Sequence, residues 1–109
     1  MVDTAGNIYA GDFALDKKNG FGKQKDVQGN YYKGKFKDGM QTGFGTMKWA
    51  NGAVYEGYWA ENNIHGFGLY VWPQNSKQFR GTYFENAIHG FGVMEWSDGR
   101  KFRGQWQDD

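Results

Sequence analysis

Residues 55–72 read YEGYWAENNIHGFGLYVW, and their pattern predicts the fold. From Tyr55 to Trp59, a large aromatic residue or a glycine stands at every second position, and this period is typical of a β-strand with two different faces. Residues 61–65 are predicted to form a turn, and residues 66–72 to return as the partner strand. The unit therefore predicts a β-hairpin.

The same unit recurs along the chain. Its start is an aromatic residue, followed two positions later by glycine and four positions later by a second aromatic residue. The five starts are Tyr9, Tyr32, Tyr55, Phe79 and Phe102. Eleven residues after each of the first four starts comes Gly-Phe-Gly, centred on Phe21, Phe44, Phe67 and Phe91. A glycine-rich linker would not keep this phase, so the chain is predicted to be a repeat protein.

Composition supports strands over disorder. The chain of 109 residues holds 18 glycines and one proline, yet 19 % of it is aromatic, whereas disordered chains are poor in aromatics. We expect an all-β fold, one elongated and twisted antiparallel meander over residues 1–109. Its full units are residues 9–31, 32–54, 55–78 and 79–101, and residues 102–109 form a partial unit. Nine strands leave eight gaps of roughly 4.8 Å, which predicts a ribbon of about 40 Å.

Turn residues fall where the hairpins need them. Gly39 stands at the turn of the second unit, and Asp16, Asn62 and Asn86 replace it in the others. Asparagine and aspartate also tolerate positive φ, so these replacements keep the turn. Asn51-Gly52 and Asp98-Gly99 are strong hairpin signals between units.

Glycine inside a strand normally weakens it. We expect neighbouring aromatic rings to lie over the bare backbone of Gly34 and Gly57, an arrangement that builds a core from one sheet. The sheet then has two open edges, which predicts a homodimer through edge strands as one mode of association. The chain opens within the tail of a preceding unit and closes midway through a fifth. We therefore expect a longer protein, or a partner that completes the edge.

This pattern resembles the MORN (membrane occupation and recognition nexus) repeat family. One unit fills every position of the family pattern: Tyr32, Gly34, Phe36, Gly39, Gly43, Gly45, Trp49 and Gly52. The first unit departs from it with Gln24 and Asp26, which predicts a weaker, cap-like repeat. The resemblance implies a non-enzymatic scaffold that binds a protein partner in a cytoskeletal, ciliary or membrane-associated assembly. It also raises an alternative, a peripheral module for anionic phospholipids and phosphoinositides.

Residues for catalysis or metal binding do not gather in the sequence. The chain has no cysteine, and Gly-Phe-Gly lacks the third glycine of a phosphate-binding loop. His65 and His89 are predicted turn residues about 10 Å apart, too far to share one ion. Ser76 and Ser97 lack a nucleophile motif. We therefore predict no enzyme activity and no catalytic, cofactor or metal site. The net charge of +1 argues against nucleic acid as a partner.

The phenylalanine row is the candidate partner-binding site. Phe21, Phe44, Phe67 and Phe91 stand at odd offsets from their flanking glycines, so they project from the opposite face and form a ladder. One interpretation is that the rings pack on neighbouring strands. The other is an aromatic groove, open to a partner such as an amphipathic helix. Sugar or choline recognition by the rings is a third and weaker hypothesis.

Lysines concentrate in the first half of the chain. Residues 1–54 hold eight lysines against five aspartates, while residues 55–109 hold five basic and seven acidic residues. Lys33, Lys35 and Lys37 alternate on one strand and are the candidate lipid-binding residues; Lys17, Lys18, Lys23 and Lys25 are expected to extend the patch. The start lacks a signal peptide and no stretch reaches the roughly 20 apolar residues of a membrane span. We expect a cytoplasmic protein, associated with the cytoskeleton or a membrane.

Overall fold

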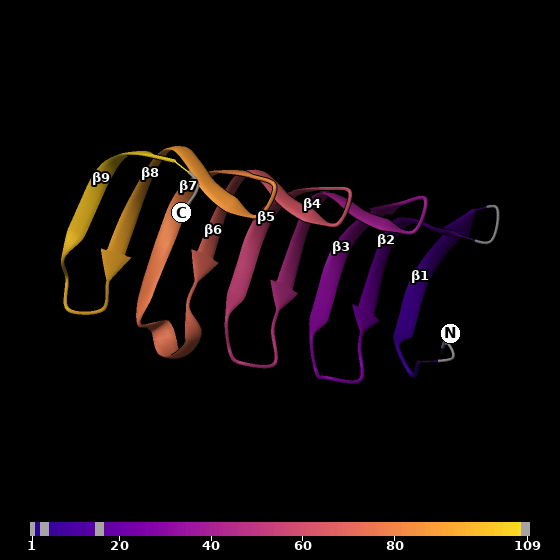
Figure 1. The fold of residues 1–109 in the computed structure, drawn as a ribbon. Coiled ribbons are helices and arrows are strands. Elements are labelled where there is room, and N and C mark those ends of the chain that lie inside the picture. The colour runs from indigo at the N-terminus through magenta and orange to yellow at the C-terminus, as the bar shows by residue number, and fades with distance from the viewer. Residues whose placement is uncertain (1, 3–4, 15–16, 108–109) are drawn as a thin grey trace.

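All regular strands of the described chain lie in one antiparallel sheet, and each pairs with its neighbours in sequence (Figure 1). The computed structural model describes residues 2, 5–14 and 17–107. The strands are β1 (Ile8–Ala14), β2 (Lys17–Lys25), β3 (Tyr31–Lys37), β4 (Met40–Lys48), β5 (Val54–Ala60), β6 (Asn63–Val71), β7 (Lys77–Phe84), β8 (Ala87–Trp96) and β9 (Lys101–Trp106). The predicted all-β meander is confirmed.

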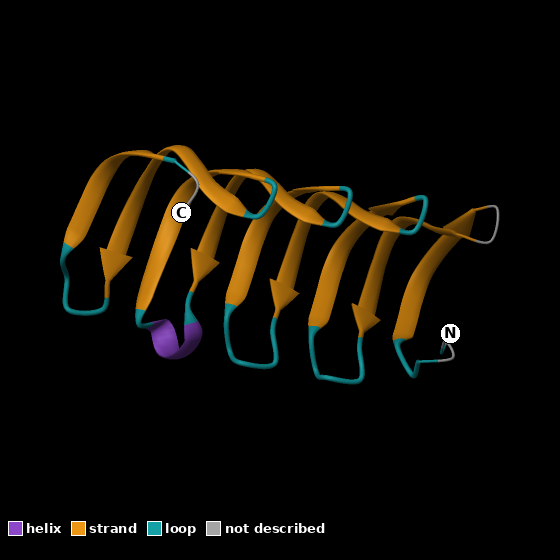
Figure 2. Cartoon of the chain, viewed as in Figure 1, coloured by secondary structure: helices purple, strands orange, loops and turns teal. Residues whose placement is uncertain are grey.

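The ribbon is one layer thick and elongated. Its principal extents are 46 × 24 × 18 Å, close to the length expected from strand spacing. Apart from the strands and turns, the described residues hold a single 3₁₀ turn, η1 (Pro73–Asn75), drawn in purple in Figure 2. This turn accommodates the extra residue of the third unit, and Gln74 and Asn75 both adopt positive φ there.

A row of glycines crosses the middle of the sheet. The paired positions, one on each strand, are Gly11, Gly22, Gly34, Gly45, Gly57, Gly68, Gly81, Gly92 and Gly104. At Gly22, Gly45 and Gly68 an added Cβ would overlap the tyrosine side chain that starts the same unit. Rings therefore lie against the bare backbone, as the strand glycines predict.

Those rings form the core of the protein on one side of the sheet, here called the core face. Tyr32, Tyr55 and Phe79 are at most 1 % exposed. Edge-to-face contacts link them into a zigzag, with ring centroids 4.9–5.6 Å apart, that runs through Phe13, Tyr9, Phe36, Tyr32, Trp59, Tyr55, Tyr83, Phe79, Trp106 and Phe102. Such pairs contribute about 0.5–1.5 kcal/mol beyond area burial. One sheet thus stabilises itself without a second layer.

Buried hydroxyls are satisfied by the chain itself. Tyr9 donates to the carbonyl of Asp12 at 2.8 Å, and Tyr55 to that of Tyr58 at 3.0 Å. Tyr32 makes the equivalent bond to Lys35 at 3.1 Å. Because burial disfavours the phenolate, the pKa of Tyr32 rises to about 12, and burial also raises the pKa of Tyr55.

The hairpin turns are tighter than the sequence predicts. Residues 61–65 were expected to form the turn, but only Glu61 and Asn62 do so, with φ of 48° and 69°, and β6 already begins at Asn63. Two successive residues with positive φ make the two-residue turn whose twist matches the strands. His65, predicted in a turn, therefore lies in β6, and His89 likewise lies in β8. The predicted turn residue Asp16 lies outside the described residues.

The first unit replaces an aromatic residue with a hydrogen-bonded turn. Asp26 stands where later units carry tryptophan, and its carboxylate accepts the backbone N–H groups of Gln28 and Asn30, each at 2.9 Å. These bonds lower the pKa of Asp26, as does the bond from the Asn30 side chain, the largest cause. Polar capping thus takes the place of ring packing at this end of the sheet.

Candidate interaction surface

The four phenylalanines of the Gly-Phe-Gly segments are exposed on the side of the sheet opposite the core rings, here called the open face. Phe21, Phe44, Phe67 and Phe91 are 71 %, 52 %, 56 % and 61 % exposed, whereas Phe79 on the core face is 0 % exposed. Both interpretations describe part of their position: the rings are half or more exposed, and Phe44 also packs on Tyr58 of the neighbouring strand.

A β-bulge in each hairpin places these rings. Gly34 pairs with Gly45, but Lys35 then pairs with Thr42, so Gly43 and Phe44 are two extra residues on β4. Gly43 has a φ of 60°, and the equivalent Gly20, Gly66 and Gly90 also have positive φ. Gly-Phe-Gly is thus a structural signature: the first glycine permits the bulge, and the second lies beneath the core ring.

Each ladder phenylalanine faces a different residue across the strand pair. The opposing pairs are Phe21 with Lys35, Phe44 with Tyr58, Phe67 with Thr82, and Phe91 with Gln105. Tyr58 is 50 % exposed and contacts Phe44 edge-to-face, with ring centroids 5.5 Å apart. Sequence reasoning missed Tyr58 as part of the ladder; its odd offset from Gly57 was the available signal.

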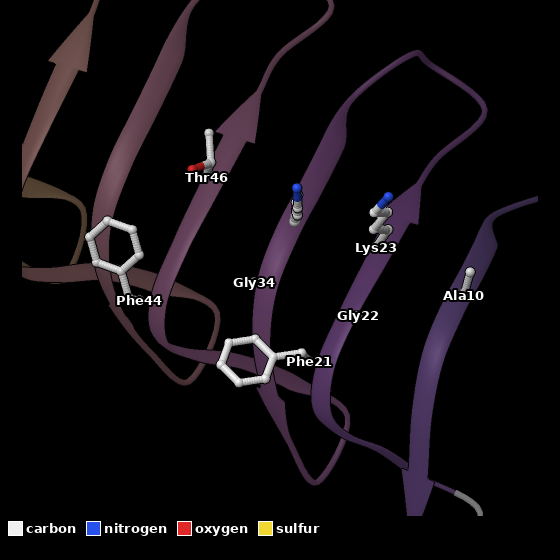
Figure 3. Close-up of a pocket in the computed structure, with 8 residues that line it drawn as sticks. Ala10, Phe21, Gly22, Lys23, Gly34, Phe44 and Thr46 are labelled. Atoms are coloured by element: carbon white, nitrogen blue, oxygen red, sulfur yellow. The ribbon is translucent and has the colours of Figure 1, made fainter.

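Hollows lie between successive ladder rings. The larger one, about 560 Å³, lies between Phe21 and Phe44, with Gly22 and Gly34 beside them. Figure 3 shows both rings at one end of this hollow, and Lys23 and Thr46 farther along the same strands. A second hollow of about 220 Å³ lies between Phe44 and Phe67. The glycine row provides a floor without side chains, and the rings provide walls.

Lysines surround the larger hollow. Lys33, Lys35 and Lys37 are all exposed on the open face of β3, as predicted from their alternation. Strand pairing adds exposed lysines of β2 and β4 to this face, and together they form what is here called the lysine cluster: Lys23, Lys25, Lys33, Lys35, Lys37 and Lys48. Lys48 was missed by sequence reasoning, although it follows Phe44 at an even offset.

Lys18 does not belong to this cluster, contrary to the sequence expectation. The bulge in β2 returns it to the core face, where its Nζ lies 5.6 Å from the ring centroid of Tyr9 and 5.5 Å from that of Phe36. The same Nζ donates to Gln24 Oε1 at 2.6 Å. Lys18 therefore stabilises the first unit by covering core rings.

Within the cluster, two like charges oppose one another. Lys23 pairs directly with Lys33 across β2 and β3, and such like-charge pairs are destabilising. The ion pairs seen among described residues lie at the other end of the sheet, Arg100 with Asp98 at 2.8 Å and Lys101 with Glu95 at 3.9 Å. Among the residues that the structure describes, no lysine of the cluster is in an ion pair, so the cluster carries positive charge beside an apolar hollow.

The core face holds a hollow of its own near the C-terminal end of the sheet. Its volume is about 440 Å³, and partly buried tryptophans, among them Trp72 and Trp96, line it. Cations already stack on these rings: Lys77 Nζ lies 4.6 Å from the ring centroid of Trp72, and the Arg100 guanidinium carbon 5.2 Å from that of Trp96. These tryptophans therefore complete the core.

Both histidines contact the ring of Phe84 at a tilted angle. Phe84 lies between them, with ring centroids 5.1 Å from His65 and 6.0 Å from His89. Among the described residues, no group of three or more histidine, aspartate or glutamate side chains is placed to hold a metal ion. No helix in this part of the chain has the length and apolarity to cross a membrane.

A comparison with known protein families agrees with the four-hairpin repeat described above. A family model described as MORN repeat matches residues 9–31, 32–54, 55–77 and 79–99. Comparison with curated proteins gives no match. The matched residues cover most of the chain and include every ladder phenylalanine.

Proposed function

Since the chain belongs to the MORN repeat family, which is not an enzyme family, we propose that it is an interaction scaffold that holds a protein partner against its open face. The observation that carries this proposal is the exposure of Phe21, Phe44, Phe67 and Phe91, each by half or more, along one side of a single sheet. Exposed apolar patches of this kind mark interaction sites.

Repeat geometry suits an extended partner. The ladder recurs once in each unit, so a segment lying along the ribbon meets one ring after another. An amphipathic helix or an extended segment with regularly spaced apolar residues has the required periodicity. A scaffold of this type brings partners together in cytoskeletal, ciliary or membrane-associated assemblies.

Partner retention on the immobilised protein tests the proposal. We expect at least one protein from a cell extract to be retained by the native chain and lost with Phe44→Ser/Phe67→Ser. Phe102→Ser is the matched control, because Phe102 is 55 % exposed but belongs to the core-face zigzag. Cross-linking should then place the retained protein on the open face. The same retained proteins on all three chains would overturn the proposal.

A second candidate function is binding to anionic phospholipids, phosphoinositides among them. The observation that favours it is the lysine cluster, in which Lys33, Lys35 and Lys37 are all exposed. Each lysine near an anionic surface contributes about 1 kcal/mol, so binding would be weak and sensitive to salt. Sedimentation with phosphatidylserine vesicles at increasing salt tests it, and attachment that persists at high salt would argue against it.

A further inference from the structure

We infer that the hollow between Phe21 and Phe44 selects an acidic segment of a protein partner, with an apolar side chain between the two rings and carboxylates on the surrounding lysines. This inference rests on the proposed function and specifies the chemistry of the partner. Three observations carry it: the shape of the hollow, the position of the charges and the opposed Lys23–Lys33 pair.

The shape of the hollow fits an apolar side chain. Ala10, Phe21 and Phe44 supply apolar contacts, and Gly22 and Gly34 expose bare backbone beside them. At about 560 Å³ the hollow is larger than its neighbour of about 220 Å³ between Phe44 and Phe67. A leucine or phenylalanine side chain seated there contacts two rings at once, and removal of its apolar surface from water favours binding.

The charges around this hollow have one sign. Lys23 and Lys33 line it directly, and Lys35 lies opposite Phe21 across the strand pair. Among the described residues, no carboxylate lines this hollow; Glu56 lies opposite Thr46 at its edge, and Asp12 lies next to Gly20. The smaller hollow differs, because Glu56 and Arg80 line it together. Charge complementarity therefore directs an acidic segment to the first hollow and gives the second no preference of this kind.

The opposed lysines add an energetic reason. Lys23 and Lys33 pair directly across the strands, whereas the next equivalent pairs, Thr46 with Glu56 and Leu69 with Arg80, place no like charges opposite one another. A carboxylate between Lys23 and Lys33 removes their repulsion. Relief of this repulsion therefore makes the free energy of binding more favourable.

A protein segment fits these charges better than a bilayer does. The lysine cluster occupies only one half of the open face, and Glu56 and Glu95 stand farther along the same ribbon. A membrane lying on this face meets those carboxylates too, while the charged residues that line the hollow itself are Lys23 and Lys33. The sheet is also twisted and its strands are bent, so a flat surface cannot follow the whole face (Figure 1).

The test uses the full chain, isotope-labelled for NMR, and a synthetic peptide that alternates glutamate with leucine around one phenylalanine. We expect backbone amide shifts confined to the open side of β2, β3 and β4, including Gly22 and Gly34. Two further peptides serve as controls: one carries lysine for every glutamate, and one carries alanine for every leucine and phenylalanine. Neither should produce these shifts.

Charge variants locate the contact. Lys33→Glu should weaken binding of the acidic peptide by about tenfold or more and raise the stability of the free protein, because Lys23 then faces an opposite charge. Arg80→Glu is the matched control, since Arg80 is exposed at the equivalent position of another unit. It should leave the affinity within about twofold.

Three results would overturn the inference. Equal binding of the lysine peptide would show that the open face takes apolar segments without charge selection, and the proposed function would stand. Shifts at the second hollow or on the core face would place the contact elsewhere. Vesicles of phosphatidylcholine and phosphatidylserine that sediment the protein, with no shift from any peptide, would assign the lysines to a membrane. Partner retention on Phe44→Ser/Phe67→Ser is measured separately, so failure of the scaffold proposal is distinguishable.

Discussion

Tyr55 lies so close to Gly68 that an added Cβ at position 68 would overlap the tyrosine hydroxyl and ring. The same hydroxyl donates to the carbonyl of Tyr58, which holds the ring against the backbone of β6. The glycine and the tyrosine are therefore one structural unit, and the repeat keeps both together. Two of the other full units show the same overlap, at Gly22 and Gly45, and in the fourth Phe79 takes the place of the tyrosine.

Substitution of Gly68 by alanine should be far more costly than the same change at the edge of the sheet. Gly68→Ala forces Tyr55 out of its position, and overpacking of this kind costs about 1–3 kcal/mol or more. Gly104→Ala is the matched control, because its Cβ would meet only Phe102 at an ordinary 3.5 Å. Chemical denaturation measures both, and similar losses of stability would contradict the ring-on-glycine core.

Phenylalanines on the two faces should respond differently to truncation. Phe79 is 0 % exposed and Phe67 is 56 % exposed, although they lie on the paired strands β7 and β6. Phe79→Ala should lower the free energy of unfolding by about 3–5 kcal/mol. Phe67→Ala should change it by less than about 1 kcal/mol, since that ring remains largely in water. A large loss on Phe67→Ala would indicate that the ladder is part of the core.

The fold was predictable because the repeat keeps its phase. Spacing of Tyr32, Gly34 and Gly45 alone predicts a hairpin meander, and rings over glycines follow from the same spacing. The bulges were not predictable, because the two extra residues in β4 become visible only when Lys35 is seen to pair with Thr42. The turn at Glu61 was likewise predicted too long, since no propensity rule favours positive φ for glutamate.

The candidate site was predictable in part. The alternation of side chains along a strand predicted Phe44 and Lys33 on the open face, because successive residues point to opposite faces. Lys18 was misassigned because the bulge in β2 shifts the period, so that it covers the rings of Tyr9 and Phe36. Whether Lys23 lies opposite Lys33 depends on the register between β2 and β3. That register cannot be predicted from the sequence until the positions of the bulges are known.

Alkaline pH should unfold the protein through its buried tyrosines. Burial raises the pKa of Tyr32 to about 12 and also raises the pKa of Tyr55 and Tyr83, while unfolded tyrosine has a pKa of about 10. The folded state therefore holds these protons more tightly. The contribution of these protonated tyrosines to the free energy of unfolding is fully present below about pH 10. It is lost as the pH rises toward about 12.

Denaturant midpoints across this pH range measure the effect. In Tyr32→Phe the loss of stability between about pH 10 and about pH 12 should be smaller, because one of the shifted groups is gone. Equal slopes for the native chain and Tyr32→Phe would show that Tyr32 does not contribute.

Gly39→Asn should stabilise the protein by completing a contact that two other hairpins already make. The Asn62 backbone N–H donates to the Gln41 carbonyl at 3.1 Å, and its side-chain Oδ1 accepts the Gln41 N–H at 2.8 Å, which clamps one hairpin to the preceding one. Asn86 makes the same two bonds with Ile64, at 2.9 Å and 2.8 Å. Gly39 donates to the Lys18 carbonyl at 2.9 Å but has no side chain for the second bond.

The position also accepts asparagine sterically. A Cβ at Gly39 would meet nothing within 4 Å, and its φ of 84° is near the 71° of Asn86, a conformation that asparagine tolerates. The added hydrogen bond should raise the free energy of unfolding by about 0.5–1.5 kcal/mol. Gly39→Ala, which meets the same φ without an acceptor, should lower it. If both variants were equally destabilised, the side-chain clamp would contribute nothing, and backbone strain alone would decide which residues the turns accept.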